Sequence, residues 1–292
     1  MPDSNENIPP ELKALLEQKR AEILVSNHAP VADFAGLSPA HMYALINFPV
    51  DSAEPPIKQQ LATPEMVETS IMCGAMLTAL NFFASDKGEK LTPQGRWPRK
   101  VLLQIYELGD GDERGYDRPP RLEEDWPIAN ALHAILVHGK LLRKAKGRMY
   151  VTKQGRNFLN VTAATAYEWI QTEFTEHFNW AYLDGYPDIV RYQQHWGFMI
   201  WLLLRFGGQE RPVSFYSEAF IKAWPMFLDE LPEDSLSLSA EERFKSVFRI
   251  RYVQRWLAWM GWIEYRYEGR GFDSEIMLKA TPVFYQRWAT FA

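Results

Sequence analysis

Residues 126–159 read WPIANALHAILVHGKLLRKAKGRMYVTKQGRNFL, and this stretch decides the fold that we expect. An apolar run ends at Gly139, and two short extended segments then flank a turn at Lys146-Gly147. Thr152 follows at a position from which it can cap the next helix. A helix, a glycine stop, a two-stranded ribbon and a new helix start form the end of a winged helix. The stretch therefore predicts a winged-helix module.

The same order returns near the end of the chain, over residues 253–288. A capping-box spacing that begins at Ser239 predicts the start of a third helix, which stops at Gly261. Alternating segments around residues 269–271 predict two strands, and Thr281 can cap a last helix. We therefore expect a mainly α fold with small β-ribbons, in which a helical linker joins two winged-helix-like modules.

Breaks in the pattern divide the chain into four segments. Apolar residues at helical spacing over 11–25 predict an amphipathic helix that packs on a domain or on a partner. The boundary before the second module falls at Asp184-Gly185-Tyr186-Pro187, which interrupts the linker helix. The expected segments are a tail with the amphipathic helix (1–35), a first winged-helix-like module with extra N-terminal helices (36–160), the linker helix (161–186) and the second winged-helix module (187–292).

Three short motifs carry a family resemblance. GLSPAHM at 36–42, FPVDS at 48–52 and LTPQGRWPRK at 91–100 resemble a group of uncharacterised bacterial proteins, over the chain up to about residue 160. Some members of that group carry a C-terminal, cysteine-rich SEC-C zinc motif, which Cys73 alone cannot build. The group has no activity to transfer, so the resemblance supports the division into segments.

Composition limits the compartment and the partners. The net charge of -5 at pH 7 argues against a protein coated in basic surface, although it permits a local basic face. The longest apolar run, 196–206, is shorter than the roughly 20 residues that span a bilayer. The polar N-terminus predicts no secretory signal, and the single cysteine excludes an intrachain disulfide. We expect a cytoplasmic protein with no membrane partner.

No catalytic motif stands out. The six histidines are scattered, and no HExxH, Gly-x-Ser-x-Gly or P-loop pattern occurs. Glu173 and His177 lie four residues apart on a predicted helix and could share a metal, but no third ligand is evident. Cys73 lies on an apolar helix, where a buried, unreactive thiol is expected. The sequence predicts a protein that is not an enzyme and that holds no metal or cofactor.

Two basic segments favour nucleic acid as a partner. The first ribbon, 140–156, holds seven cations and no Asp or Glu, and could lie along phosphates. Four more cations occupy one face of the third helix of the second module, 243–255. The candidate residues are Lys140, Arg143, Lys144, Lys146, Arg148, Lys153, Arg156, Lys245, Arg249, Arg251 and Arg255.

Three features oppose nucleic-acid binding. Acids crowd residues 123–125, where the third helix of the first module starts and would meet phosphate. The loop 109–120 stands where that module needs its middle helix. The second ribbon balances its cations with acids, namely Arg266 and Arg270 with Glu264 and Glu268.

A protein-interaction scaffold or regulatory module is the preferred function, and sequence-tolerant DNA binding or transcriptional regulation is the alternative. Alternation along the first strand of the second ribbon puts Trp262 outward beside Trp259. Two indoles next to Arg255 would form an anchor of the kind that is enriched at interfaces. We therefore expect a protein partner or self-association at this edge, with DNA as the other possible partner.

Overall fold

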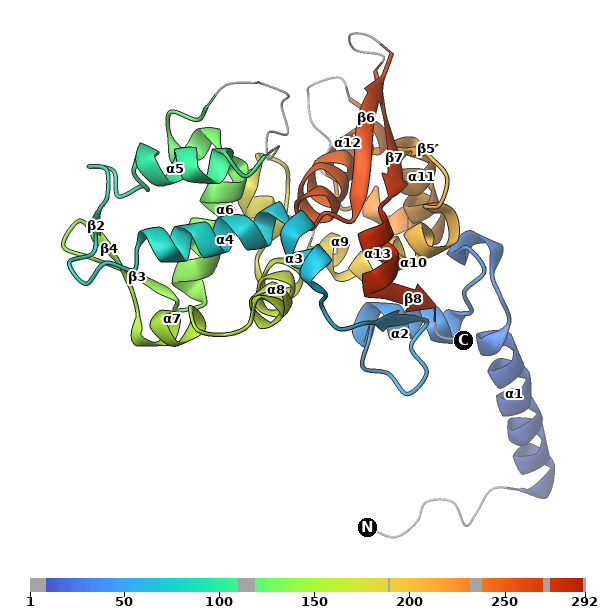
Figure 1. The fold of residues 1–292 in the computed structure, drawn as a ribbon. Coiled ribbons are helices and arrows are strands. Elements are labelled where there is room, and N and C mark those ends of the chain that lie inside the picture. Colours follow the sequence, from blue (N-terminus) through green and yellow to red (C-terminus); the bar gives the residue numbers. More distant parts are fainter. Residues whose placement is uncertain (1–8, 110–118, 189, 232–237, 270–273, 291–292) are drawn as a thin grey trace.

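The computed structural model describes residues 9–109, 119–188, 190–231, 238–269 and 274–290 (Figure 1). The described chain is mainly helical, with three small antiparallel sheets. This confirms the expected mainly α fold with small β-ribbons. Two of the sheets have three strands each and lie in different halves of the chain.

The first half places three helices before a ribbon. Its elements are α4 (Ile71–Phe82), β2 (Glu89–Lys90), α5 (Arg99–Tyr106), α6 (Pro127–His138), β3 (Leu142–Ala145), β4 (Arg148–Val151) and α7 (Lys153–Phe158). The strands pair in the order β2-β4-β3, so the earliest strand joins the edge of the ribbon. α5 lies between β2 and α6, and residues 110–118 of the loop that was expected in place of a middle helix lie outside the described residues.

The second half repeats that order. Its elements are α10 (Trp196–Phe206), β5 (Arg211–Pro212), α11 (Val213–Ala223), η5 (Pro225–Phe227), α12 (Ala240–Phe248), the π-helix η6 (Arg249–Leu257), β6 (Ile263–Glu268), β7 (Glu275–Ala280) and α13 (Pro282–Arg287). The sheet order is β5-β7-β6. The predicted capping box is present, because the Ser239 hydroxyl accepts from the Glu242 amide while the Glu242 carboxylate accepts from the Ser239 amide.

The linker joins the halves through several short helices. It comprises α8 (Ala163–Thr172), the π-helix η3 (Glu173–His177) and η4 (Trp180–Leu183), and α9 (Val190–Gln194) then begins the second half. In Figure 1 the linker elements lie between the first half and the second half. The linker is therefore in a position to contact both.

The N-terminal helix α1 (Pro10–His28) projects away from the rest of the molecule (Figure 1). None of its residues is buried, so the expected packing on the chain's own domain is wrong. The segments that follow return to the body: η1 (Ala32–Phe34), α2 (Pro39–Asn47), β1 (Ile57–Gln59) and α3 (Pro64–Thr69). β1 pairs antiparallel with β8 (Trp288–Thr290), which ties the two ends of the body together.

The buried side chains form one continuous hydrophobic core that runs through both halves. Tryptophans connect its parts: the Trp196 and Trp288 rings are 5.6 Å apart, and those of Trp262 and Trp288 are 5.5 Å apart. Trp262 is fully buried and Trp259 is 1% exposed, so the expectation of two outward-facing indoles is wrong. The aromatic-rich composition fills this shared core.

Candidate nucleic-acid interface

The first ribbon owes its shape to local backbone chemistry. Lys146 and Gly147 both have positive φ angles, 48° and 69°, which turn the chain tightly between β3 and β4. The Thr152 hydroxyl accepts a hydrogen bond from the Gly155 amide at 2.9 Å and begins α7. Alternation along the strands then buries Leu142, with Met149 and Val151 opposite, and leaves the charged side chains outside.

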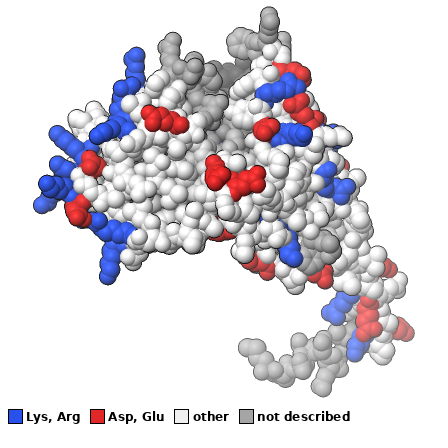
Figure 2. Space-filling model, viewed as in Figure 1, with Lys and Arg blue, Asp and Glu red and all other residues white. Residues whose placement is uncertain are grey.

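Six of the seven cations of 140–156 are exposed, and Arg148 is half-buried. Arg148 donates to the Gly88 carbonyl at 2.8 Å, and the Arg143 guanidinium lies over the Tyr150 ring at 4.8 Å. Among the described residues, Arg156 alone of the seven pairs with a carboxylate, that of Asp86 at 2.9 Å. Figure 2 shows Lys and Arg side chains gathered at this end of the molecule. Six of the seven ribbon cations therefore have no carboxylate partner among the described residues.

Neighbouring segments extend this basic surface. Lys87 and Lys90 are exposed at the strand β2, which pairs with β4. The Lys144 ammonium reaches the Gly95 carbonyl at 3.4 Å, which brings the loop after β2 to the ribbon. We refer to Lys87, Lys90 and the seven ribbon cations as the basic ribbon surface.

The acids at 123–125 do not oppose this surface as expected. The Glu123 side chain is fully buried, and its carboxylate lies 2.8 Å from the His133 ring nitrogen. Glu124 pairs with the Arg96 guanidinium at 2.6 Å. Glu123 therefore holds the start of α6 inside the fold, and a phosphate on the ribbon would not meet it.

In contrast, most of the candidate cations of 243–255 form ion pairs with carboxylates. Lys245 is paired with Glu241 at 2.7 Å and with Glu218 at 3.2 Å. Arg251 and Arg255, which the sequence analysis placed among the candidate phosphate contacts on one face of this helix, are buried, with 2% and 5% of their surface exposed. Arg249 is exposed.

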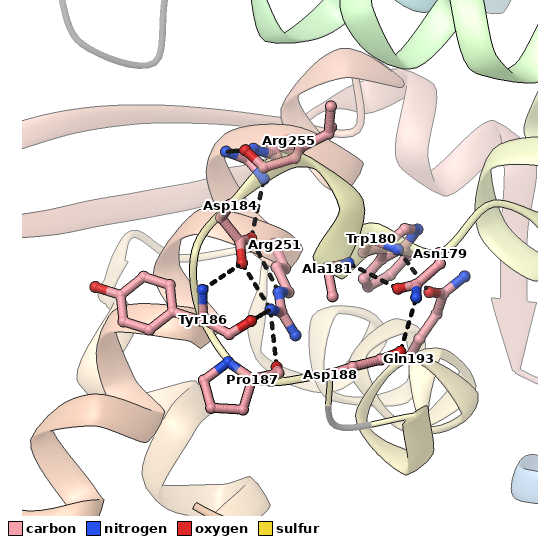
Figure 3. Close-up of polar contacts among 11 residues, drawn as sticks. Asn179, Trp180, Ala181, Asp184, Tyr186, Pro187, Asp188, Gln193, Arg251 and Arg255 are labelled. Atoms are coloured by element: carbon pink, nitrogen blue, oxygen red, sulfur yellow. Dashed lines mark hydrogen bonds and ion pairs between the residues drawn. The ribbon is translucent and has the colours of Figure 1, made fainter. Parts of the chain in front are cut away.

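Asp184 holds both buried arginines (Figure 3). Its carboxylate accepts from Arg251 Nε at 3.0 Å and Nη2 at 2.7 Å, and from Arg255 Nη1 at 3.1 Å. Arg251 also donates to the Pro187 carbonyl at 3.1 Å. A bidentate, buried arginine–carboxylate contact is strong and geometrically specific. We call Asp184, Arg251 and Arg255 the arginine clasp, and it fastens the end of the linker to η6.

The predicted interface edge is covered by the chain itself. Trp262 Nε1 donates to the Tyr167 hydroxyl of α8 at 2.9 Å, and the Ser70 hydroxyl donates to the Trp259 carbonyl at 3.2 Å. Both partners lie outside the second half. Strand alternation could not reveal this cover, because it shows which residues share a face and not what lies on that face.

The residues considered for metal or catalytic chemistry have ordinary surroundings. The Glu173 carboxylate lies 3.2 Å from the His177 ring nitrogen, and no group of three metal-ligating side chains lies together in the described part of the chain. Cys73 is buried, as expected, and burial raises the pKa of its thiol to about 12. A thiol with so high a pKa stays protonated and unreactive at neutral pH.

Comparison with known proteins gives one match. Residues 68–165 match the family model of the Y4jL N-terminal domain, an uncharacterised family. The matched segment extends from the end of α3 to the start of α8 and therefore contains the sheet β2-β4-β3 and the ribbon cations. No curated protein and no solved structure matches the chain.

Among the described helices, none has the length and apolar character needed to cross a bilayer.

Proposed function

We propose that this chain contains two winged-helix modules, over 36–160 and 187–292, and that the first ribbon binds the phosphate backbone of nucleic acid. The modules are supported by the order helix, strand, helix, helix, ribbon, which occurs in both halves. The strand orders β2-β4-β3 and β5-β7-β6 support them further, because in each sheet the first strand pairs with the last.

The observation that carries the binding proposal is the exposed charge of the basic ribbon surface. Cations that no carboxylate neutralises attract phosphates, and the release of bound counterions favours the complex. Lys144 and Lys146, at the tip of the ribbon, are exposed and make no ion pair with any described carboxylate. They are the two residues that we expect to contribute most.

Binding of this kind tolerates changes in base sequence. Base edges are usually read by the third helix of a winged helix. Here α6 packs against η4 of the linker, and the arginine clasp occupies two cations of η6. The basic ribbon surface is left to contact phosphates, which carry no direct sequence information.

Titration of a labelled DNA duplex with the full chain at several salt concentrations tests the proposal. We expect binding at low salt and a steep loss as salt is added, with the slope reduced by about two in the double variant Lys144→Glu/Lys146→Glu. The matched control, Arg266→Glu/Lys279→Glu, makes the same charge change on exposed positions of the second ribbon. Absence of binding at low salt, or an equal loss in both variants, would contradict the proposal.

A scaffold function remains the second candidate, and α1 is the observation that favours it. Six large apolar side chains of this helix are 41–73% exposed: Leu12, Leu15, Leu16, Ile23, Leu24 and Val25. Most of the stability of a helix in a protein comes from packing of its apolar side chains, so contact with another chain would stabilise α1. Sedimentation analysis of the full chain and of Leu16→Glu/Ile23→Glu tests this function. The scaffold function is supported if the unmodified chain self-associates and the variant is a monomer. If both are monomers, α1 does not mediate self-association.

A further inference from the structure

A pocket of about 420 Å³ lies where the end of the linker meets the second half. Three segments contribute most of its lining. Residues 175–181 run from η3 into η4, residues 46–51 end α2 and continue into the loop behind it, and residues 192–194 end α9. The pocket therefore lies at a junction of separate parts of the chain, where small-ligand sites are common.

Two π-helices reach this pocket. Thr175, Glu176 and His177 are the last three residues of η3, and Arg251 belongs to η6. The two helices are joined directly, because Trp256 Nε1 of η6 donates to the Thr175 hydroxyl at 2.8 Å. π-Helical turns are rare and occur frequently at functional sites. Their convergence at one pocket favours a ligand site here.

Side-chain hydrogen bonds hold the wall of the pocket in place. Gln193 donates to the carbonyls of Thr175 and Phe178 at 2.9 and 2.7 Å, so it fixes the end of η3. Asn179 donates to the Asp188 carboxylate at 2.8 Å (Figure 3). A site that is ordered before binding loses little conformational entropy when a ligand enters.

The charge of the pocket favours a cation. Asp51, Glu176 and Asp188 line it, and none of the three forms an ion pair with a described lysine or arginine. Partial burial raises the pKa of the Glu176 carboxyl, and the charge of Asp51 raises it further, whereas His177 lowers it. Arg251 also lines the pocket, but its charge is balanced within the arginine clasp. The lining therefore carries an excess of negative charge.

The arrangement of these carboxylates favours an extended cation. No group of three metal-ligating side chains lies together among the described residues, so the three acids do not converge on one metal ion. The pocket also offers apolar surface, including Phe48, which is 51% exposed, and the partly buried Phe178. Methylene groups pack on such rings, and an ammonium that lies over an aromatic face is attracted to it.

We propose that this pocket binds a linear polyamine. Its ammonium groups pair with Asp51, Glu176 and Asp188, and the methylene segments between them pack on Phe48 and Phe178. The charges of a polyamine are spread along a chain, which suits carboxylates that do not share one ion. The cavity volume is within the range of roughly 300–1,000 Å³ that is usual for small-molecule sites. None of these residues belongs to the basic ribbon surface, so the site is independent of the function proposed above.

Isothermal titration calorimetry of the full chain with spermidine tests this site, with Mg²⁺ and butylamine as separate arms. Spermidine is expected to bind about tenfold more tightly than either, because Mg²⁺ lacks the apolar contacts and butylamine carries a single charge. Asp51→Asn/Glu176→Gln is expected to weaken spermidine binding about tenfold, through loss of two partly exposed charge pairs. The matched control Glu68→Gln/Glu107→Gln makes the same change of charge at exposed positions outside the pocket, and it should leave the affinity unchanged.

Phe48→Ala separates a specific site from the general attraction of a polycation to an acidic chain. It should weaken spermidine binding about threefold, by loss of a cation–π and apolar contact, and leave the binding of Mg²⁺ unchanged. Phe48 is half exposed and both substituted acids are exposed, so these variants should keep the fold, which circular dichroism checks. If Phe48→Ala fails to fold, Phe48→Leu retains apolar volume and should still weaken binding, because the ring is lost.

Four outcomes would overturn the proposal. Spermidine might fail to bind at millimolar concentration, or Mg²⁺ or butylamine might bind as tightly as spermidine. The two double variants might lose affinity equally, which would assign the binding to net charge. Replacement of the Phe48 ring might change nothing, which would remove the apolar part of the site.

Discussion

The first ribbon and the helix α12–η6 each carry several cations close together in the sequence. In the fold, the cations of the ribbon are mostly exposed and unpaired, whereas most of those on the helix are paired with carboxylates. On the ribbon, six of seven cations are exposed and Arg156 alone has a described carboxylate partner. On the helix, two arginines are buried against Asp184 and Lys245 is shared between two glutamates. The difference lies in the carboxylates, because Asp184 is 67 residues from Arg251. The availability of the two arginines therefore depends on a distant acid, which the local density of charge does not reveal.

The largest expected effect comes from opening the arginine clasp. We expect Asp184→Ala to lower the free energy of unfolding by about 3–5 kcal/mol, because it leaves two buried guanidinium groups without their shared carboxylate. Asp86→Ala removes the partner of Arg156 on the ribbon and serves as the matched control. The Asp86 side chain is 91% exposed, so its loss should cost less than about 1 kcal/mol. Urea unfolding of both variants measures the contrast, and equal effects would show that burial does not distinguish the two runs.

Local patterns predicted much of the architecture. A cap residue predicted the start of α12, a glycine stop predicted the end of α6, and alternation predicted both ribbons, because these features depend on neighbouring residues. Exposure was harder to predict. Arg251, Trp259 and Trp262 were expected outside and are buried, because α8 and the linker cover them. No local rule shows which distant segment will cover a given face.

The same reason explains which site residues could be predicted. The ribbon cations are recognisable in the sequence, since seven positive charges without an acid form a local pattern. Asp184 was recognised as part of a helix break and not as an ion-pair partner.

Low pH should destabilise the second half more than the first half because of His195. This histidine is buried in the second half against Trp224, and the two ring centroids are 4.3 Å apart. Burial lowers the pKa of this imidazole to about 4. In the unfolded chain the pKa is about 6.5, so unfolding takes up a proton between these values. The stabilisation is therefore complete above about pH 6.5, and about 3 kcal/mol is lost as the pH falls to 4.

Urea unfolding at pH 7 and pH 4.5 measures this loss, and hydrogen exchange shows where it begins. We expect residues 190–257 to lose protection before the first half does. In His195→Leu the pH dependence should shrink, whereas His138→Gln, at an exposed position of α6, should retain it. An unchanged pH dependence in His195→Leu would assign the acid sensitivity to other groups.

A smaller effect is expected where the linker meets the second half. Trp262→Phe removes the hydrogen bond to the Tyr167 hydroxyl and part of a buried ring, which should cost about 1–2 kcal/mol of unfolding free energy. Tyr167→Phe removes the other partner of the same bond. If this bond fastens the linker to the second half, the double variant should cost less than the sum of the two single losses. Strict additivity would show that the two side chains stabilise the fold independently.

The smallest effect on stability is expected at the second ribbon, where a cation is exposed but paired with carboxylates. Arg266 donates to Glu210 at 2.6 Å and to Glu268 at 3.3 Å, and these contacts lie on exposed surface. The hydrogen bond from Arg266 holds the pKa of the Glu210 carboxyl below its ordinary value, so this carboxylate stays charged at neutral pH and offsets the charge of the guanidinium. Glu210→Gln/Glu268→Gln should change stability by less than about 1 kcal/mol, as is usual for surface pairs.

The same double variant should bind the DNA duplex about two- to fivefold more tightly at low salt, because Arg266 then becomes available to a phosphate. Glu54→Gln/Glu68→Gln removes two exposed acids elsewhere, which changes the net charge by the same amount and controls for the overall charge. If the double variant binds no better while Lys144→Glu/Lys146→Glu still binds worse, an available cation is not sufficient. In that case the position of the first ribbon, beside β2 and the loop that follows it, decides where phosphate binds.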